Sequence, residues 1–229
     1  MNIAVFCSSS DNVGEKYRKV AAAHIGSAVD LGLSVMWAEV NVGASKPEEA
    51  GYFFTWGDVE PVSTARGWSN YRWSNGSEYA LRKYNTQSNR GSVDMRTTLL
   101  PEDDAATVYW QSDWRMPTKE EVDELFKKCK WEWTELNGVA GCKVTGPNGN
   151  HIFLPHMGCY NSSGYDMKGV KGYYWTSSID PENPQNSYYL CTHADNDYAD
   201  YNSQARTAGR SVRRSYLPKL WHYGHFPLP

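Results

Sequence analysis

The residues from Asn186 to Gln204, NSYYLCTHADNDYADYNSQ, come from a narrow set of side chains. Fourteen of these nineteen residues are Asn, Asp, Tyr, His, Ser or Thr, and Lys, Glu, Val and Ile are absent. Tyrosine supplies a large, stiff contact surface, and Asn, Ser and Asp supply adaptable hydrogen bonds, which is the mixture that antibody binding loops use. The segment is therefore either a solvated loop or a surface whose side chains contact a ligand.

Two short strands joined by a polar turn are predicted within this segment. Along SYYLCTH, alternation places Tyr189, Cys191 and His193 on one side, and Leu190 marks the other side as the buried one. The following turn and strand are exposed in this interpretation, with two arginines at their rim. The candidate ligand-binding residues are therefore Tyr189, His193, Asp195, Asn196, Asp197, Tyr198, Asp200, Asn202, Gln204, Arg206 and Arg210. A plain solvated hairpin is the alternative, because segments rich in Asn and Asp are usually only turns.

Side chains that suit catalysis or metal binding are present, but their spacing is unfavourable. The carboxylates of DND at 195–197 suit a hard cation, although most such clusters are solvated turns. His151 and His156 flank a strand and a proline, and His222 and His225 stand in an aromatic tail, which are poor geometries for a shared metal. No GxSxG, Walker A or HExxH sequence is present. We therefore expect no catalytic residue, no metal and no cofactor.

The composition favours β and irregular structure over long aliphatic helices. The 229 residues include ten Trp and sixteen Tyr, and such rings fit best in strands. The length allows one large domain or two small ones. A net charge of -3 gives no general attraction to nucleic acid or to an anionic membrane, although ARTAGRSVRR contains four Arg. We expect no nucleic-acid partner.

The cysteine pattern indicates reduced thiols in the core rather than a disulfide framework. An odd number leaves at least one thiol unpaired, and no CxxC pair occurs among Cys7, Cys129, Cys142, Cys159 and Cys191. The opening MNIAVFCSSSDNVGEKYRK has too short an apolar run for a secretory signal. No window reaches the roughly 18 apolar residues of a membrane span. Neither an export signal nor a span is therefore expected.

Three regions are expected along the chain. Residues 1–26 contain a strand candidate, IAVFC, and a helix candidate, VGEKYRKVAAAHIG, which resemble the opening of the nucleotide-hydrolase family once described as lysine decarboxylases. The glycine-rich phosphate loop of that family has no counterpart downstream, so we interpret this region as an appended leader without its own active site. Residues 27–216 are expected to form the main domain, followed by a C-terminal tail, residues 217–229.

Local signals predict two helices among many short strands. The clearest helix is TKEEVDELFKKC, over 119–129, because it has a capping box and apolar residues at helical spacing; we expect it to bury Val122, Leu125 and Phe126. PEDDAATVYW predicts a shorter helix with proline and acids at its start. The Asn137–Gly138 pair between two alternating runs predicts a hairpin. Residues 62–96, rich in Ser, Asn, Gly and Arg, predict a long surface insertion. The expected fold class is α+β.

Nine motifs follow one another in an order that is more specific than any one of them. They run from VDLGLSVMWAEVNVGA through GYFFTWGDVEP, DWRMPTKEEVDELF and GYYWTSS to GRSVRR, within residues 28–215. This order resembles the "major paralogous domain" family of gut bacteria. That family looks like a branch of the C-type-lectin-like fold, which also holds formylglycine-generating enzymes and the variable proteins of diversity-generating retroelements. The resemblance implies a C-type-lectin-like domain of short antiparallel strands, two helices and long irregular loops.

The resemblance also implies a role for the narrow alphabet of residues 186–204. In retroelement-diversified proteins, mutation at template adenines turns Asn codons into Tyr, Asp, His, Ser or Thr codons on a ligand-facing C-terminal surface. The alphabet of this segment looks like that outcome. It implies a candidate paratope on a fixed scaffold, whose partner is a protein or glycan on a cell surface. The same resemblance suggests the cell surface or a virion as the location.

The alternatives within this fold differ in what the C-terminal surface does. A non-diversified carbohydrate-binding or adhesin module is the second interpretation. A calcium lectin would need an EPN- or QPN-like loop followed by WND, and PENPQN at 181–186 supplies only a scrambled fragment. An oxidase like the formylglycine-generating enzymes comes last, because the GGSW segment is missing and Cys159 and Cys191 stand 32 residues apart. We expect a binding and display protein rather than an enzyme; the oligomeric state stays open.

Overall fold

The computed structural model describes residues 28–110, 113–193 and 198–216, with the backbone alone for 198–201. The helices in these ranges are α2 (Ala105–Trp110) and α3 (Lys119–Lys128), with 3-10 turns η1 (Trp68–Asn70), η2 (Ser88–Arg90) and η3 (Pro101–Asp103). The strands are β1 (Ala28–Val29), β2 (Met36–Asn41), β3 (Phe53–Phe54), β4 (Lys130–Leu136), β5 (Val139–Thr145), β6 (His151–Pro155), β7 (Met157–Asn161), β8 (Gly164–Lys168), β9 (Lys171–Ile179), β10 (Asn186–His193), β11 (Tyr198–Ala205), β12 (Arg210–Ser211) and β13 (Arg213–Tyr216). These mixed sheets with two helices confirm the α+β class. The predicted leader, 1–26, and tail, 217–229, lie outside the described residues.

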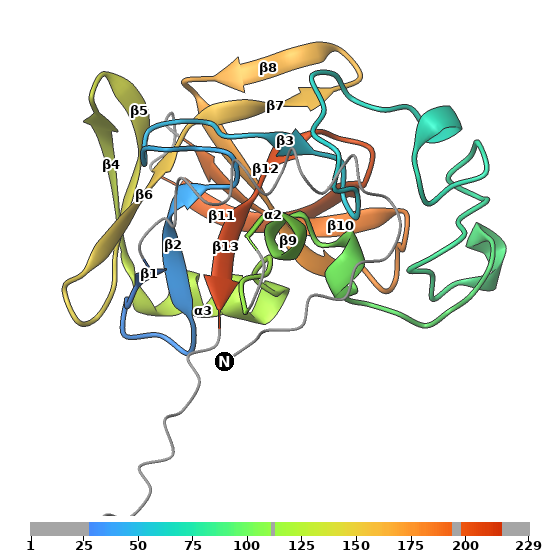
Figure 1. Cartoon of the computed structure of the whole chain (residues 1–229), viewed down its shortest axis with the longest axis horizontal. Coiled ribbons are helices and arrows are strands. Elements are labelled where there is room, and N and C mark those ends of the chain that lie inside the picture. The colour runs from blue at the N-terminus through green and yellow to red at the C-terminus, as the bar shows by residue number, and fades with distance from the viewer. Residues whose placement is uncertain (1–27, 111–112, 194–197, 217–229) are drawn as a thin grey trace, which may run out of the picture.

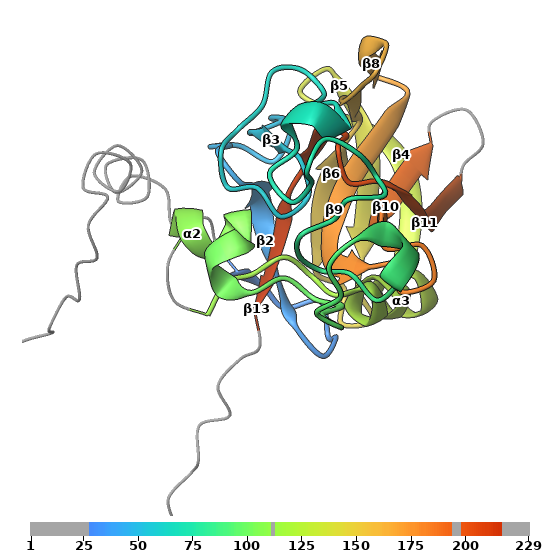
Figure 2. The ribbon, with the colours of Figure 1, turned by 90° about the vertical axis from the view of Figure 1, so that its right-hand side faces the viewer.

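The strands form three sheets that bring the first and last described strands together. The largest sheet has the order β11-β10-β9-β12-β3, and β7 and β8 extend it from β9. A second sheet consists of β4, β5 and β6. In the third sheet β2 lies between β1 and β13 (Figure 1). Helix α3 contacts β9, β10 and β11, whereas α2 lies on the other side of the molecule, near β2 and β13 (Figure 2).

The hairpin predicted at Asn137–Gly138 is confirmed. Strands β4 and β5 pair in register from Lys130↔Thr145 to Leu136↔Val139. Both turn residues have positive φ, 51° for Asn137 and 78° for Gly138. A two-residue turn with this geometry matches the twist of the flanking strands, which is why Asn-Gly favours it.

Helix α3 is confirmed almost as predicted. The side chain of Thr118 accepts from the backbone of Glu121, whose own side chain accepts from the backbone of Thr118, so that the capping box is complete. Val122 and Leu125 are fully buried in the core. Phe126, expected to be buried, is half-buried and stacks on Trp131, with ring centroids 4.9 Å apart. The helix ends at Lys128, one residue earlier than predicted.

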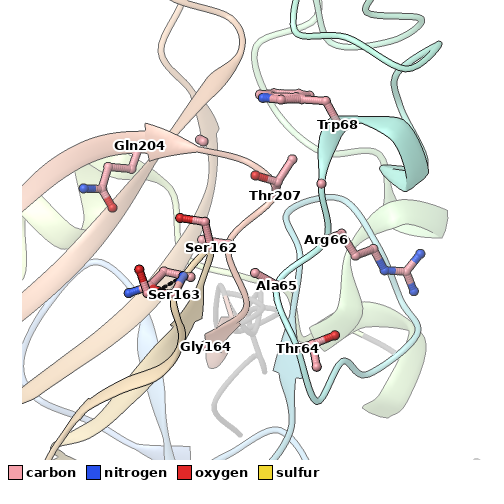
Figure 3. Close-up of a pocket in the computed structure, with 13 residues that line it drawn as sticks. Thr64, Ala65, Arg66, Trp68, Ser162, Ser163, Gly164, Gln204 and Thr207 are labelled. Atoms are coloured by element: carbon pink, nitrogen blue, oxygen red, sulfur yellow. Dashed lines mark hydrogen bonds between the residues drawn. The ribbon is translucent and has the colours of Figure 1, made fainter.

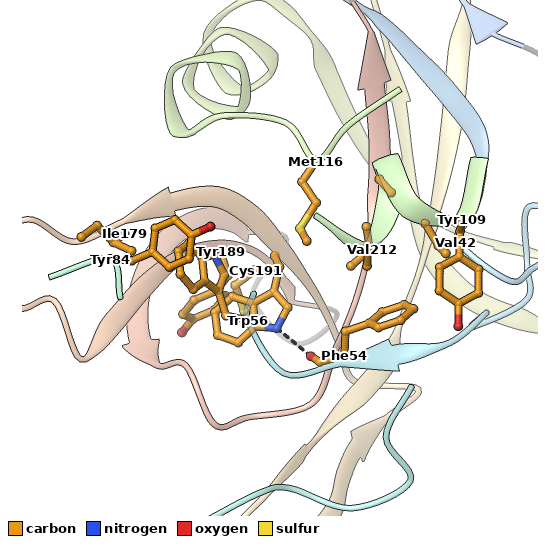
Figure 4. Packing of buried hydrophobic residues seen from close by; sticks show 13 residues of the cluster. Val42, Phe54, Trp56, Tyr84, Tyr109, Met116, Ile179, Tyr189, Cys191 and Val212 are labelled. Carbon is orange, nitrogen blue, oxygen red and sulfur yellow. Dashed lines mark hydrogen bonds between the residues drawn. The ribbon is translucent and has the colours of Figure 1, made fainter. Parts of the chain in front are cut away.

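Two hydrophobic clusters lie on opposite faces of the central strands. One cluster is mostly aromatic and includes Trp56, Trp175 and Tyr189 (Figure 4). Its two tryptophans join β9 to the segment around β3, because Trp175 Nε1 donates to the carbonyl of Phe54 at 2.9 Å and Trp56 Nε1 donates to that of Thr176 at 2.8 Å. The other cluster lies under α3 and the β4-β5-β6 sheet. Rings therefore supply much of the burial, as the composition predicts.

The segment 62–96 is more than the surface insertion expected from its composition. It contains η1, η2 and isolated bridges rather than long strands. Tyr71 and Tyr84 are nevertheless buried, at 2% and 0% exposed. The hydroxyl of Tyr71 donates to the carbonyl of Trp56 at 2.7 Å, and the hydroxyl of Tyr84 lies 2.6 Å from Asp103 Oδ2. These two rings anchor the insertion to the domain, a long-range contact that composition does not reveal.

The cysteines of the described residues are free thiols, as predicted. Cys142, Cys159 and Cys191 are buried and Cys129 is partly buried. Burial raises the pKa of Cys142 to about 12 and that of Cys129 to about 11. These two thiols therefore stay protonated at neutral pH and act as small apolar core groups.

Replacing Leu125 by Ala should lower the free energy of unfolding by about 2 to 5 kcal/mol, because truncation of a fully buried side chain leaves a cavity. Lys127→Ala, at an exposed position of the same helix, is the matched control and should change it by less than about 0.5 kcal/mol. Chemical denaturation measures both values. Equal losses in the two variants would show that α3 is not part of the core.

Candidate ligand-binding surface

Strand β10 lies inside the largest sheet, between β9 and β11, and β11 lies at the edge. The β10–β11 pair is antiparallel and continuous from Asn186↔Ala205 to His193↔Tyr198. The two strands predicted for the candidate segment are thus present. The turn that joins them, with the candidates Asp195, Asn196 and Asp197, lies outside the described residues.

The expectation that one side of β10 is exposed is wrong, because both of its faces are covered. Tyr189 and Cys191 are each 4% exposed and pack in the aromatic cluster. Leu190, 2% exposed, packs on the opposite face in the cluster under α3. Alternation along the strand holds, but it separates two cores rather than a core from solvent. Tyr189 therefore belongs to the core.

Arg206 is also buried, although the sequence placed it at the rim of the candidate surface. Its side chain is 0% exposed. Nη1 donates to the carbonyl of Lys83 at 3.2 Å, and Nη2 donates to the carbonyl of Tyr84. The guanidinium carbon lies 5.0 Å from the centroid of the Trp56 ring. Carbonyl and aromatic partners explain the burial, and they tie the 62–96 insertion to the end of β11.

Arg210, the second arginine expected at the rim, is 1% exposed and lies among three aromatic rings. Its guanidinium carbon is 3.4 Å from the ring centroid of Tyr189, 4.3 Å from that of Trp175 and 5.1 Å from that of Tyr173. Such positions over a ring face attract a cation. Nη2 donates to the side-chain oxygen of Gln204 at 2.5 Å. Arg210 is therefore a core residue that reaches the surface through Gln204.

Three further candidates, His193, Asn202 and Gln204, stay near the surface. Asn202 and Gln204 are exposed on β11, and His193 is partly exposed at the end of β10. Tyr198 pairs with His193 and Asp200 pairs with Cys191 along the backbone. The strand thus carries Tyr198, Asp200, Asn202 and Gln204 at alternate positions, as the sequence predicts.

A groove lies beside the C-terminal end of β11, with a volume of about 940 Å³. Three segments form it: residues 64–68 of the insertion, residues 161–164 at the turn from β7 to β8, and residues 204, 205, 207 and 208 (Figure 3). We call it the Trp68 groove after the one aromatic residue among the described residues that line it. Of the predicted site residues, Gln204 lines it. In the view of Figure 3, Thr207 and Ser162 lie between Gln204 and Trp68.

Backbone hydrogen bonds hold the walls of the Trp68 groove in place. The amide of Arg66 donates to the carbonyl of Thr207 at 3.1 Å, which joins the insertion to the segment after β11. Tyr160 and Gly209 exchange two backbone bonds of 2.8 Å, which join β7 to the same segment. A Cβ at position 209 would lie 3.0 Å from that of Tyr160, so glycine permits this close approach. Hydrogen bonds of the backbone therefore fix the walls of the groove relative to one another.

Sequence reasoning missed the groove because its walls are far apart in the chain. Trp68 falls in a stretch without regular periodicity, and Asn161, Ser162 and Ser163 have the composition of an ordinary turn. The signal that was available is the tryptophan itself, since a large ring in a polar insertion needs a packing partner or a ligand.

One thiol–imidazole contact has the parts of a nucleophilic site. Cys191 Sγ lies 3.2 Å from His193 Nε2, and such pairs activate catalytic cysteines. Cys191 is 4% exposed and packed in the aromatic cluster, so the sulfur has little access to a substrate. Among the described residues, no three His, Cys, Asp or Glu side chains are grouped as a metal site requires.

Comparison with models of known families, with curated proteins and with solved structures finds no match. None of the helices in the described part of the chain is both long enough and apolar enough to cross a bilayer.

His156 is a buried histidine where β6 meets β7. It is 1% exposed, and its ring centroid lies 5.0 Å from that of Trp133. Burial, with a smaller effect of His193, lowers its pKa to about 4. The imidazole is therefore neutral at pH 7.

We predict that His156 makes folding stability depend on pH below 6.5. The unfolded chain takes up this proton near pH 6.5 and the folded protein only near pH 4, so that the unfolded state binds more protons between these values. The stabilisation is complete above pH 6.5 and is lost as the pH falls to 4. From pH 7 to pH 5 the loss is about 2 kcal/mol. His156→Leu should remove this part of the decrease, as measured by denaturation at both pH values.

Asp104 titrates in the same pH range, and its effect on folding stability has the opposite sign to that of His156. Burial raises the pKa of its carboxyl group to about 6, so its contribution is present at low pH and is lost as the pH rises through 6. Wild type and His156→Leu share Asp104, and its effect cancels in their difference. Parallel pH profiles of the two proteins would contradict the prediction.

Proposed function

We propose that the chain is a ligand-binding display protein of the C-type-lectin-like fold, related to the family that its nine ordered motifs resemble. The arrangement of short antiparallel strands, two helices and long irregular segments supports this proposal. The pairing of β2 with β13 adds support, because it fixes both ends of the domain in one sheet. A scaffold closed in this way is suited to hold a variable surface near its C-terminus.

The observation that carries the proposal is the position of β11 at the edge of the largest sheet. Asn202 and Gln204 are exposed on this strand, while Ser203 between them is partly buried and its hydroxyl lies 3.0 Å from Asp180 Oδ2. Asn202 and Gln204 thus meet solvent from a backbone that the rest of the sheet fixes. The proposed ligand surface consists of Tyr198, Asp200 and Asn202 together with the candidates Asp195, Asn196 and Asp197.

The proposed mechanism is recognition by a rigid scaffold. A ligand-binding surface on a paired strand has little backbone freedom to lose, so that more of the contact energy appears as affinity. Tyr and Asn side chains then supply contact area and adaptable hydrogen bonds. The proposed partner is a protein or glycan on a cell surface, and the proposed location is the cell surface or a virion.

A non-diversified adhesin is the second candidate function, and the Trp68 groove favours it because a concave site does not require a variable strand. The DNA around the gene separates the two. Diversification requires a near-identical repeat beside a reverse-transcriptase gene, which differs at adenines opposite codons 186–204. Without such a repeat the adhesin becomes the better account.

Replacing Tyr198, Asp200 and Asn202 together by Ala should weaken ligand binding sharply while leaving the fold intact. Exposed substitutions usually change stability by less than about 0.5 kcal/mol each, whereas loss of several central contacts weakens binding by about tenfold or more. The measurements are a melting curve and binding to a panel of purified bacterial surface proteins and glycans.

The matched control is a second triple variant at exposed positions outside β11 and outside the helix that contacts it, made of Lys46→Ala, Thr134→Ala and Glu135→Ala. It should keep both stability and binding. A large loss of stability in the β11 variant would place its side chains in the core. If both stability and binding are unchanged in the β11 variant, the ligand site lies elsewhere than on β11.

A further inference from the structure

We infer that the Trp68 groove binds a neutral oligosaccharide. This inference rests on the proposed binding function and assigns a ligand class to the groove beside β11. Three properties of the groove carry it: its size, its aromatic wall and the hydroxyl and amide groups of its lining.

The size of the groove suits several linked sugar rings. Ligand sites in proteins usually measure about 300 to 1,000 Å³, and the volume of about 940 Å³ lies near the upper end. Three separate segments enclose it, and backbone bonds fix them to one another. A preformed groove of this kind binds without a large cost of ordering.

Trp68 gives the groove a flat apolar surface with a fixed orientation. The Trp68 side chain is half-buried, and its ring meets that of Tyr71 edge to face, with centroids 5.5 Å apart and planes at 89°. Tyr71 is itself buried and held by its hydroxyl. The negative face of an aromatic ring attracts C–H groups that carry partial positive charge. A sugar ring has one face of C–H groups and a rim of hydroxyls, so it matches such a wall.

The polar groups that line the groove are amides and hydroxyls. Beside the charged Arg66, they come from Thr64, Asn161, Ser162, Ser163, Gln204 and Thr207. Each of these groups both donates and accepts hydrogen bonds, and a sugar hydroxyl does the same. The Asn161 amide already has protein partners, because its oxygen accepts from the amide of Ser163 at 2.8 Å and its nitrogen donates to Asp166 at 3.4 Å. Because Gln204 accepts from Arg210 through its side-chain oxygen, its amide group remains as a donor. The lining therefore offers the mixed donors and acceptors that an array of hydroxyls requires.

The charge of the lining argues for a neutral ligand. Arg66 is the one charged residue among the described lining residues, and no carboxylate lines the groove. Nη1 of Arg66 lies 3.3 Å from Asp58 Oδ2, whose side chain is 4% exposed. In Figure 3 the Arg66 side chain points away from Ser162 and Gln204. A phosphate or an acidic glycan would require cations directed at the ligand.

The test starts from an array of neutral, sialylated and sulfated glycans, followed by titration calorimetry with the neutral glycan that binds best. We expect binding to neutral glycans and a loss of affinity of about tenfold for Trp68→Ala, the equivalent of ~1.4 kcal/mol. Tyr79→Ala is the matched control, because it removes an aromatic side chain, 61% exposed, from the same insertion but outside the groove. Tyr79→Ala should bind like wild type.

A second variant keeps the test valid if Trp68→Ala fails to fold. Ser162→Trp fills the groove from an exposed turn position, and it should abolish glycan binding without a change in melting temperature. Binding of no neutral glycan, preference for the charged glycans, or full affinity in the folded groove variants would overturn the inference.

The β11 triple variant separates this inference from the proposed function. Asn202, the one of its three positions whose side chain the structure describes, is not among the residues that line the groove. We therefore expect the variant to keep neutral-glycan binding in the groove while it loses the partner bound by β11. If the β11 variant loses its partner and the wild-type protein binds no glycan, the groove inference is wrong and the proposed function stands. If glycan binding depends on Trp68 and no partner requires β11, the proposed function is wrong and the groove inference stands.

Discussion

The burial of four guanidinium groups in the closing segment is the constraint on which the rest of this structure depends. Arg206, Arg210, Arg213 and Arg214 are each at most 1% exposed. A buried charge is costly unless it is paired or hydrogen-bonded. Backbone carbonyls and aromatic rings meet part of this need. Arg213 donates to the carbonyls of Ala38, Glu39 and Phe153. The guanidinium carbon of Arg214 lies 3.1 Å from the ring centroid of Trp110, but its three nitrogens have no hydrogen-bond partner among the described residues. Burial lowers the pKa of Arg213 to about 10. Buried rings thus take the place of some of the hydrogen bonds that these arginines lack.

These arginines also explain how a chain with few long elements keeps its segments in register. Arg213 connects β13 to β2 and β6, which belong to different sheets. Arg206 connects the end of β11 to the insertion through the carbonyls of Lys83 and Tyr84. The insertion has little regular structure of its own, so this connection and the buried rings of Tyr71 and Tyr84 give it a position. The wall of the Trp68 groove depends on that position, although no arginine of the closing segment lines the groove.

Local signals in the sequence predicted the local structure, and long-range contacts decided the rest. The capping box of α3 and the Asn-Gly turn act over a few residues, and both are present where expected. The polarity of Arg206 and Arg210 suggested exposure, because a single sequence does not show the carbonyls and rings that surround them. The sequence also did not predict the aromatic cluster on the face of β10 opposite Leu190. Tyr189 and Cys191 on that face suit either a core or a binding surface. The groove joins residues near 66, 162 and 206, and local reasoning reaches none of those contacts.

The arrangement of β11 sets a limit on how far a variable surface can extend. Along an edge strand the exposed side chains contribute little to either core, so they can change while the scaffold stays folded. Asn202 satisfies this condition, because it is exposed and its neighbour Ser203 makes the contact with Asp180. Gln204 does not, even though it is exposed, because it accepts the hydrogen bond of the buried Arg210. Loss of that acceptor would leave a buried guanidinium group with less compensation. Under the proposed function, position 204 therefore tolerates less variation than position 202, because a change at 204 also affects the buried Arg210.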